Sequence, residues 1–381
     1  MIERSTKTNA MTVNQMVEQL STAYISLIKA NVQFKNFPSV MLWGAPGVGK
    51  SQGVRQIASE IRQKTGKRVD ITDVRLLLFN PVDLRGIPTA NAEKTLAVWL
   101  RPKIFQMDAS ADVVNLLFLD EISAAPQSVQ AAAYQITLDR TVGEHRLPEN
   151  CIVMAAGNRV TDKSVAFNMP KALANRLCHI EIEGDVESWH RWAIGAGIHR
   201  FVLGFIDYNP DMLMAFDPQS NQLAFPTPRS WEMVSNILNF ISEDVTAVMP
   251  LIVGCVGEQA AYELRAWNRV YSKIPTMEDI FEGKTKSMPV RPEGLYAVSS
   301  YIVNYASTHC SESEIRNALH YVASMPLEFK HRIYTRIFCR SKGSTSIWNE
   351  IWIIRLGLNA TAMIGSDTAY DDRAKEAEIT G

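Results

Sequence analysis

The stretch Gly44-Ala45-Pro46-Gly47-Val48-Gly49-Lys50-Ser51 decides the fold, because it fits the pattern G-x-x-x-x-G-K-S/T at every position. The apolar run Val40–Trp43 before it predicts a short buried strand, and Ser51–Lys64 after it predicts a helix that stops at Gly66. A strand, a glycine-rich turn and a helix in this order form a cradle for phosphate groups, since backbone N–H groups and the helix N-terminus attract negative charge.

The residue types in this loop predict a nucleotide site. Its glycines let backbone N–H groups turn inward without a Cβ in the way. We expect Lys50 to reach the β- and γ-phosphates and the Ser51 hydroxyl to ligate Mg²⁺. Gly49–Gly53 also spells G-x-S-x-G, the nucleophile elbow of hydrolases, but that reading leaves three residues of the longer pattern unexplained. The chain has no N-K-x-D guanine motif, so the sequence favours ATP over GTP.

A pair of carboxylates follows a second apolar run. Val113–Leu119 predicts a buried strand, and Asp120 and Glu121 come directly after it. At the carboxyl edge of a parallel sheet, Asp120 can hold Mg²⁺ through its water shell, and Glu121 can polarise the attacking water as a general base. The alternative is that the pair caps the following helix, into which Pro126 leads.

Three more polar residues are weak candidates when taken singly. Asn158 ends the apolar run Cys151–Gly157, where its amide could hydrogen-bond a water or a phosphate, although Gly-Asn is an ordinary turn signal. Arg176 closes a predicted helix, and Arg229 opens another one. Lone arginines are mostly solvated or paired on the surface, so their types alone do not assign them to a nucleotide.

The order of predicted elements indicates an α/β fold followed by helices. Strands that alternate with helices and have apolar cores favour a mostly parallel sheet with helices on both faces. From about Val186, long helical patterns replace the strands, over Ser188–Ile206, Trp231–Phe240 and Val245–Val270. We therefore expect a nucleotide-binding core in residues 1–185, a helical lid in 186–270, a helical extension in 271–364 and a flexible acidic tail in 365–381.

The composition sets further limits. With 46% hydrophobic residues among 381, the chain can bury a sizeable core, and its formal net charge of −1 provides no overall field to attract nucleic acid or anionic membrane. Five scattered cysteines predict reduced thiols, and the adjacent pair Cys178-His179 is unsuited to hold one metal ion. Apolar runs such as Ala247–Gly257 are shorter than the ~20 residues that span a bilayer. We expect a cytoplasmic protein.

Over residues 12–270 the chain resembles the MoxR family of AAA+ ATPases, with its motifs in register. Gly44–Ser51 matches the Walker A motif, and Val113–Glu121 matches Walker B. Asn80–Pro88 is similar to the insertion in helix 2 that marks this clade, and Leu138–Pro148 is similar to the hairpin before sensor 1.

The resemblance implies roles for the three remaining residues. Asn158 stands at the sensor 1 position, Arg176 at that of the arginine finger, and Arg229 at that of sensor 2 in the lid. It also implies a homohexameric ring whose arginine finger acts in trans. Chaperone-like work on a protein client is implied as well, with a possible partner bearing a von Willebrand factor A domain. Arg159 departs from the family, because many relatives have proline there.

Three functions therefore compete. The first is a ring ATPase, dependent on Mg²⁺, that remodels a protein client. The second is a motor subunit that grips DNA or RNA, which Arg85, Arg101 and Lys103 near the insertion would permit and the neutral net charge does not encourage. The third is a scaffold that binds ATP without hydrolysing it.

Overall fold

The computed structural model describes residues 9–159, 169, 174–217, 219–271, 274–306, 311–330 and 333. The chain divides into two compact units. Unit 1 comprises Met1–His199 and Asn209–Tyr262, and unit 2 comprises Arg200–Tyr208 and Glu263–Gly381. The four-part division expected from the sequence stays a prediction, and its final part, residues 365–381, lies outside the described residues.

Unit 1 is built on a six-stranded sheet in the order β1-β10-β2-β9-β6-β3, in which every neighbouring pair is parallel. The strands are β1 (Ala10–Thr12), β2 (Val40–Trp43), β3 (Arg68–Arg75), β6 (Val113–Asp120), β9 (Cys151–Gly157) and β10 (Cys178–Glu183). The expected parallel sheet is therefore confirmed. The edge strand β1 was not predicted, because three residues are too few to show an alternating pattern.

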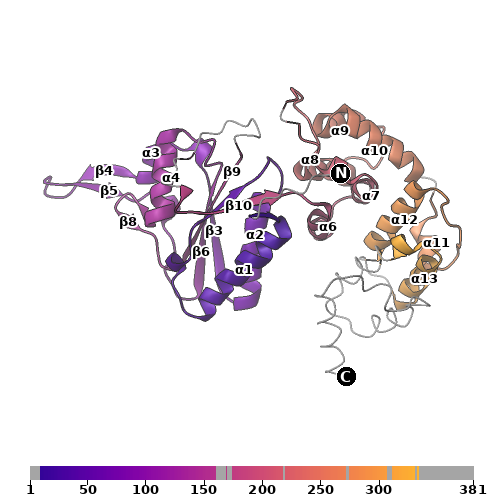
Figure 1. The fold of residues 1–381 in the computed structure, drawn as a ribbon, viewed down its shortest axis with the longest axis horizontal. Helices are drawn as coiled ribbons and strands as arrows, with labels where there is room; N and C mark the ends of the chain where they lie inside the picture. The colour runs from indigo at the N-terminus through magenta and orange to yellow at the C-terminus, as the bar shows by residue number, and fades with distance from the viewer. Residues whose placement is uncertain are drawn as a thin grey trace, which may run out of the picture. The chain divides into compact units, whose positions relative to one another are not determined.

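Helices cover both faces of this sheet (Figure 1). Successive strand residues point to opposite faces, so neighbours on β6 enter different cores: Leu116 packs with α1 (Val13–Lys29) and α2 (Lys50–Thr65), and Leu117 packs with α4 (Gln127–Asp139). Burial on both faces explains why the central strands read as continuous apolar runs.

The remaining helices are divided between the two units. Unit 1 also contains α3 (Pro81–Arg85), α6 (Val186–Gly195), α8 (Pro228–Phe240) and α9 (Met249–Val256). Unit 2 contains α7 (Arg200–Tyr208), α11 (Met277–Phe281), α12 (Pro292–Tyr305) and α13 (Glu312–Ala323), and α10 (Glu258–Tyr271) runs across the boundary. Short 3-10 turns are η1 (Phe34–Asn36), η2 (Leu76–Leu78), η3 (Lys103–Phe105) and η5 (Pro210–Leu213). Within unit 2, the buried Asp207 carboxylate accepts a 2.7 Å hydrogen bond from Ser300 and links α7 to α12.

Two segments that were predicted to be continuous helices are each broken into two. Ser188–Ile206 is divided between α6 and α7, and Gly197 between them has a φ of +71°. Val245–Val270 is divided between α9 and α10 at Gly257, whose φ is +82°. A left-handed residue ends a helix, and glycine adopts this conformation without steric cost. The apolar spacing continues through both glycines, so periodicity alone does not reveal the breaks.

The region without a clear period, residues 80–105, contains α3 and a hairpin of β4 (Ile87–Ala90) and β5 (Ala97–Leu100). This hairpin extends from the sheet at the left of Figure 1. A second hairpin, of β7 (Thr141–Val142) and β8 (His145–Arg146), follows α4. None of the helices among the described residues is long and apolar enough to cross a membrane.

Candidate functional site

The phosphate loop joins β2 to α2, as the sequence predicts. Gly47 and Gly49 have φ angles of +77° and +106°, in the left-handed region that favours glycine. Gly49 is the residue before the helix, so α2 begins at Lys50 and directs its free N–H groups toward the loop. A Cβ on Gly44 would lie 2.8 Å from the carbonyl oxygen of Ile182, so the strand is also tightly packed where the loop begins. The backbone thus has the form that an anion requires.

Lys50 and Ser51 form hydrogen bonds to different partners around this loop. Lys50 is 8% exposed, and its ammonium group donates to the carbonyl oxygens of Gly44 at 2.7 Å and Ala45 at 3.1 Å. The same ammonium donates to Oδ1 of Asn158 at 3.0 Å. The Ser51 hydroxyl donates to Oδ2 of Asp120 at 2.8 Å. The two hydrogen bonds that cross to other strands bring Walker A together with Asp120 and Asn158.

Glu121 has an unusual backbone conformation. Its φ is +59°, which costs a residue with a side chain about 1–3 kcal/mol and is found mostly where the surroundings enforce it. Three hydrogen bonds hold the turn: the Glu121 N–H donates to Oδ1 of Asp120 at 2.9 Å, and its carbonyl accepts from Ala124 at 3.0 Å. The N–H of Ile122 donates to Ala156 on β9 at 3.0 Å. The Asp-Glu pair therefore forms a fixed turn that lines the pocket, before α4 begins at Gln127.

Ser123, which no sequence motif singles out, also belongs to the site. This side chain is 5% exposed, and its hydroxyl accepts the backbone N–H of Asn158 at 2.9 Å. A Cβ on Gly157 would lie 2.7 Å from the Ser123 hydroxyl, so glycine at that position leaves room for the contact. Ser123 thereby fixes Asn158 from the turn that carries Glu121. The residues are 35 apart in sequence, and a serine after an Asp-Glu pair has no distinctive pattern.

We predict that Ser123→Ala lowers kcat about ten-fold without changing KM, because one positioning hydrogen bond of ordinary strength is lost. In an Asn158→Ala background the same change should cost nothing further, since Ser123 acts through Asn158. Steady-state ATPase kinetics of the single and double variants measure this. The matched control is Ser39→Ala, which removes an equally buried hydroxyl that donates to Thr137 away from the pocket. Additive losses would contradict the role.

Arg229 reaches the pocket from the start of α8. Thr227 caps this helix by accepting the N–H of Ser230 at 3.1 Å, while the Ser230 hydroxyl accepts the N–H of Thr227 at 2.8 Å. A Cβ on Gly47 would lie 3.1 Å from the Thr227 side chain, so the helix start lies against the phosphate loop. Arg229 is exposed but lines the pocket, consistent with a side chain available to a ligand.

Arg176 and Arg159 lie in different surroundings. Arg176 is exposed in the turn before β10 and is not among the residues that line the pocket. Arg159 forms an ion pair of 3.4 Å with Glu181 on β10, and it does not line the pocket either. The structure therefore brings together the phosphate loop, Asp120, Glu121, Asn158 and Arg229, and it leaves Arg176 outside.

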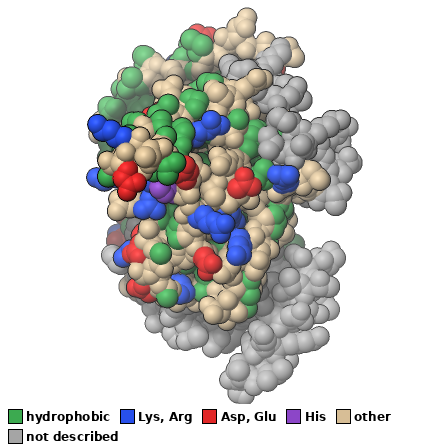
Figure 2. All heavy atoms as spheres, turned by 90° about the vertical axis from the view of Figure 1, so that its left-hand side faces the viewer, with side chains coloured by type: hydrophobic (Ala, Val, Ile, Leu, Met, Phe, Trp, Pro, Cys, Tyr) green, Lys and Arg blue, Asp and Glu red, His purple; other side chains and the backbone are tan. Residues whose placement is uncertain are grey.

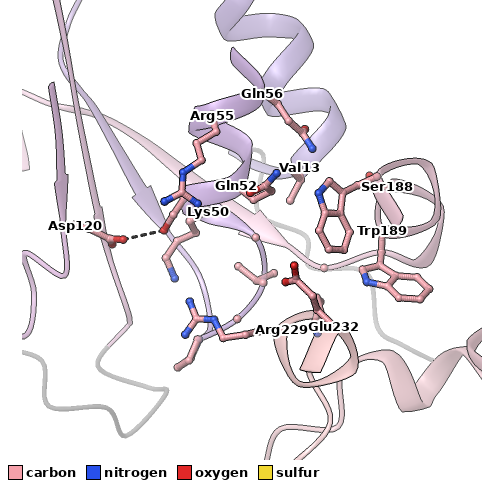
Figure 3. A pocket seen from close by; sticks show the side chains of 18 of the residues that line it. Val13, Lys50, Gln52, Arg55, Gln56, Asp120, Ser188, Trp189, Arg229 and Glu232 are labelled. Atoms are coloured by element: carbon pink, nitrogen blue, oxygen red, sulfur yellow. Dashed lines mark hydrogen bonds between the residues drawn. The ribbon is translucent and has the colours of Figure 1, made fainter. Parts of the chain in front are cut away.

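Figure 3 shows the resulting pocket. In that view Lys50, Asp120 and Arg229 extend toward one end, and Gln56 and Ser188 lie toward the other. Val13, Trp189 and Trp192 also line the pocket, which therefore includes aromatic side chains beyond the phosphate loop. The described residues contain no group of three or more His, Cys, Asp or Glu side chains that could hold a metal ion. Any metal here would therefore need oxygens from the nucleotide or from water in addition to Ser51 and Asp120.

Residues 39–179 match the model of a family described as the ATPase family associated with various cellular activities (AAA). The match includes Gly44–Ser51, Asp120, Glu121, Asn158 and Arg176, and it covers a little over a third of the chain. A comparison with curated proteins gives no match. The family match supports an AAA+ ATPase, and the fold is that of the P-loop AAA+ class.

RuvB, NtrX and PCH-2 are among the solved structures whose folds are similar to that of this chain. The RuvB of Thermotoga maritima, in a mutant form, is 15% identical, with a TM-score of 0.36 over 81% of this chain and 89% of that one. NtrX from Brucella abortus in complex with ATP is 12% identical, with a TM-score of 0.36 over 87% and 68%. PCH-2 of C. elegans is 13% identical, with a TM-score of 0.35 over 67% and 66%. At these scores the likenesses carry no argument about what this chain does.

Proposed function

We propose that this chain is a Mg²⁺-dependent ATPase of the MoxR type that assembles into a head-to-tail ring and remodels or assembles a protein client. One observation carries the proposal. The pocket gathers Lys50, Asp120, Glu121 and Asn158, whereas Arg176, the expected arginine finger, lies exposed outside it. A hydrolytic site whose expected arginine finger lies outside the pocket is what a ring with that arginine supplied in trans requires.

The residues of the loop suit a triphosphate. The left-handed glycines shape the loop for close approach of phosphate oxygens, and the buried Lys50 ammonium provides positive charge at its base. Ser51 and Asp120, which share a hydrogen bond, are the oxygen ligands expected to hold Mg²⁺, Asp120 through its water shell. Bound Mg²⁺ would neutralise charge that develops on the phosphate oxygens.

We propose that Glu121 and Asn158 bind and orient the attacking water. The fixed turn presents the Glu121 carboxylate at the pocket, where it can accept the proton of an attacking water. Oδ1 of Asn158 accepts from Lys50, so Nδ2 is the group of this side chain that can donate to the water or to a phosphate oxygen. Holding both partners in place lowers the entropic part of the barrier.

The proposed role of Arg176 determines how the subunits must contact one another. A guanidinium group that serves another subunit's pocket requires an interface between two different surfaces, and such an interface closes into a ring when its rotation closes. The MoxR resemblance proposes six subunits. Nucleotide-dependent contact of Arg229 with the phosphates would then report on the occupancy of the pocket from α8.

A protein client is favoured by the surface of the β4–β5 hairpin. Ile87, Leu96 and Leu100 are 61%, 67% and 58% exposed there, and exposed apolar side chains gathered together mark surfaces that bind proteins. Figure 2 shows hydrophobic side chains beside Lys and Arg on the face that includes this hairpin. The β7–β8 hairpin supports it, because His145 lies 2.7 Å from the carbonyl oxygen of Trp99 on β5. A partner with a von Willebrand factor A domain remains part of the proposal through the resemblance alone.

The nucleic-acid alternative rests on Arg85, Arg101 and Lys103, which are exposed near the same hairpin. ATPase assays with single-stranded DNA, duplex DNA and RNA separate the two functions. We predict stimulation below about two-fold by each, because the chain has no overall positive field. Strong, salt-sensitive stimulation by any of them would replace the protein client with nucleic acid, whereas absence of ATP hydrolysis would favour the scaffold.

The client itself can be identified with a substrate trap. A Glu121→Gln ring loaded with ATP should hold the client, because the cycle stops before release. Mass spectrometry of proteins that co-purify with this variant, compared with those that co-purify with Lys50→Ala, identifies partners that depend on the ATP state.

A further inference from the structure

A hydrogen-bonded pair of rings lies next to the phosphate loop. Trp43, the last residue of β2 and the one before Gly44, donates its indole N–H to Nδ1 of His179 at 2.8 Å. The two rings are nearly parallel, with an interplanar angle of 14° and centroids 6.0 Å apart. In the parallel register of β10 and β2, His179 lies opposite Met41, two residues before Trp43. The two side chains therefore point to the same face of the sheet.

The other ring nitrogen of His179 reaches a second segment. Nε2 lies 2.7 Å from the carbonyl oxygen of Ala174. An indole N–H can only donate, so Nδ1 must accept, and Nε2 then carries the hydrogen and donates to Ala174. One imidazole tautomer thus connects the end of β2 to the turn before β10.

That turn carries Arg176. The Ala174 carbonyl also accepts the N–H of Leu177 at 3.2 Å, and Leu177 is 8% exposed in the core beneath α4. Arg176 stands between these two fixed residues, and its own side chain is exposed. A buried neighbour on one side and the imidazole contact on the other limit the directions in which the arginine can point.

We infer that Trp43 and His179 are positioning residues for Arg176: they tie the strand that leads into the phosphate loop to the turn that presents the arginine to the neighbouring subunit. The inference rests on the proposed function, because it assigns a purpose to the contact only if Arg176 acts in trans. The contact between Trp43 and His179 would also couple the pocket of one subunit to the pocket of the next. Gly44, which follows Trp43, accepts a hydrogen bond from Lys50, so a shift of the loop in one subunit displaces the anchor of the arginine that serves the next.

His179→Phe tests the inference, because it keeps a planar ring and removes both hydrogen bonds. In homogeneous rings we expect ATP affinity to be unchanged and ATP hydrolysis to fall on the order of ten-fold, as two positioning hydrogen bonds of ordinary strength are lost. Trp43→Phe removes one of the two and should cause a smaller loss. The matched control is Tyr321→Phe, which keeps the ring, removes a 2.7 Å hydrogen bond to the backbone carbonyl of Ser287 within unit 2, and should keep the wild-type rate.

Mixed rings separate a lost position of Arg176 from damage to the local pocket. His179→Phe subunits keep their own phosphate loop, and Lys50→Ala subunits keep a correctly placed Arg176. Hydrolysis per His179→Phe subunit should therefore recover when the two are mixed, as it should for Arg176→Ala mixed with Lys50→Ala. A merely structural defect in the pocket would not recover.

The outcomes distinguish the inference from the proposed function. If Arg176→Ala recovers in verified mixed rings and His179→Phe and Trp43→Phe do not, the inference is wrong and the ring mechanism stands. If Arg176→Ala itself does not recover, action in trans fails and the inference fails with it. Wild-type hydrolysis by folded rings of both variants would also overturn the inference. Should His179→Phe not fold, as judged by circular dichroism, Trp43→Phe is put through the same mixture.

Discussion

We expect Glu121→Gln to lower kcat for steady-state ATP hydrolysis by about 10²–10⁴-fold and to leave ATP binding within about two-fold of wild type. The amide has nearly the shape of the carboxylate and fits the same left-handed turn, but it cannot accept the proton of the attacking water. Phosphate release measures kcat, and equilibrium binding of a fluorescent ATP analogue measures affinity.

The matched control for this prediction is Glu60→Gln, the same substitution on an exposed residue of α2 that pairs with Lys64 at 2.7 Å outside the pocket. It should keep the wild-type rate. An unchanged rate in Glu121→Gln would remove Glu121 from its role, and a parallel loss of ATP binding would indicate that the turn had collapsed instead.

We expect Arg176→Ala to lower hydrolysis in homogeneous rings by about 10³–10⁵-fold, the range typical of arginine fingers, because charge on the transferring phosphoryl group would no longer be compensated. The loss is reversed by mixing with Lys50→Ala subunits, which are inactive for a different reason: they cannot hold the triphosphate, but their arginine is intact. The activity of mixtures over a range of ratios, with ring composition verified by native mass spectrometry, measures this.

The control for the mixing experiment is Arg191→Ala, which removes an exposed guanidinium from α6 that pairs with Glu187 at 2.8 Å within its own helix. It should hydrolyse ATP alone at the wild-type rate. If Arg176→Ala rings retain hydrolysis without any partner, Arg176 is not the arginine finger, and one of the other exposed arginines takes that place in the proposal.

The strands that build the pocket were predictable from the sequence, because a strand buried on both faces consists of consecutive apolar residues. Val40–Trp43 and Cys151–Gly157 are buried on both faces, so they appear as unbroken apolar runs, and the polar residues that follow them reach the same edge of a parallel sheet. The placement of Asp120 and Asn158 beside the phosphate loop follows from this logic once the strands are recognised.

The contacts that refine the site were not predictable in this way. Ser123 meets Asn158 because the strand order places β6 beside β9, and Trp43 meets His179 because it places β10 beside β2. The sequence does not reveal these contacts, because the two residues of each pair are 35 and 136 positions apart. The left-handed turn at Glu121 was equally hidden, because a non-glycine residue adopts it only when tertiary hydrogen bonds enforce it.

The central claim is that the pocket of one subunit hydrolyses ATP only when a neighbour completes it. The most direct measurement is the ATPase rate per subunit across a dilution series, with the mass of the assembly determined in the same samples by analytical ultracentrifugation. We predict that the rate rises with the assembled fraction and that the dilute monomer binds ATP without turning it over. A monomer that hydrolyses ATP at the full rate would contradict it.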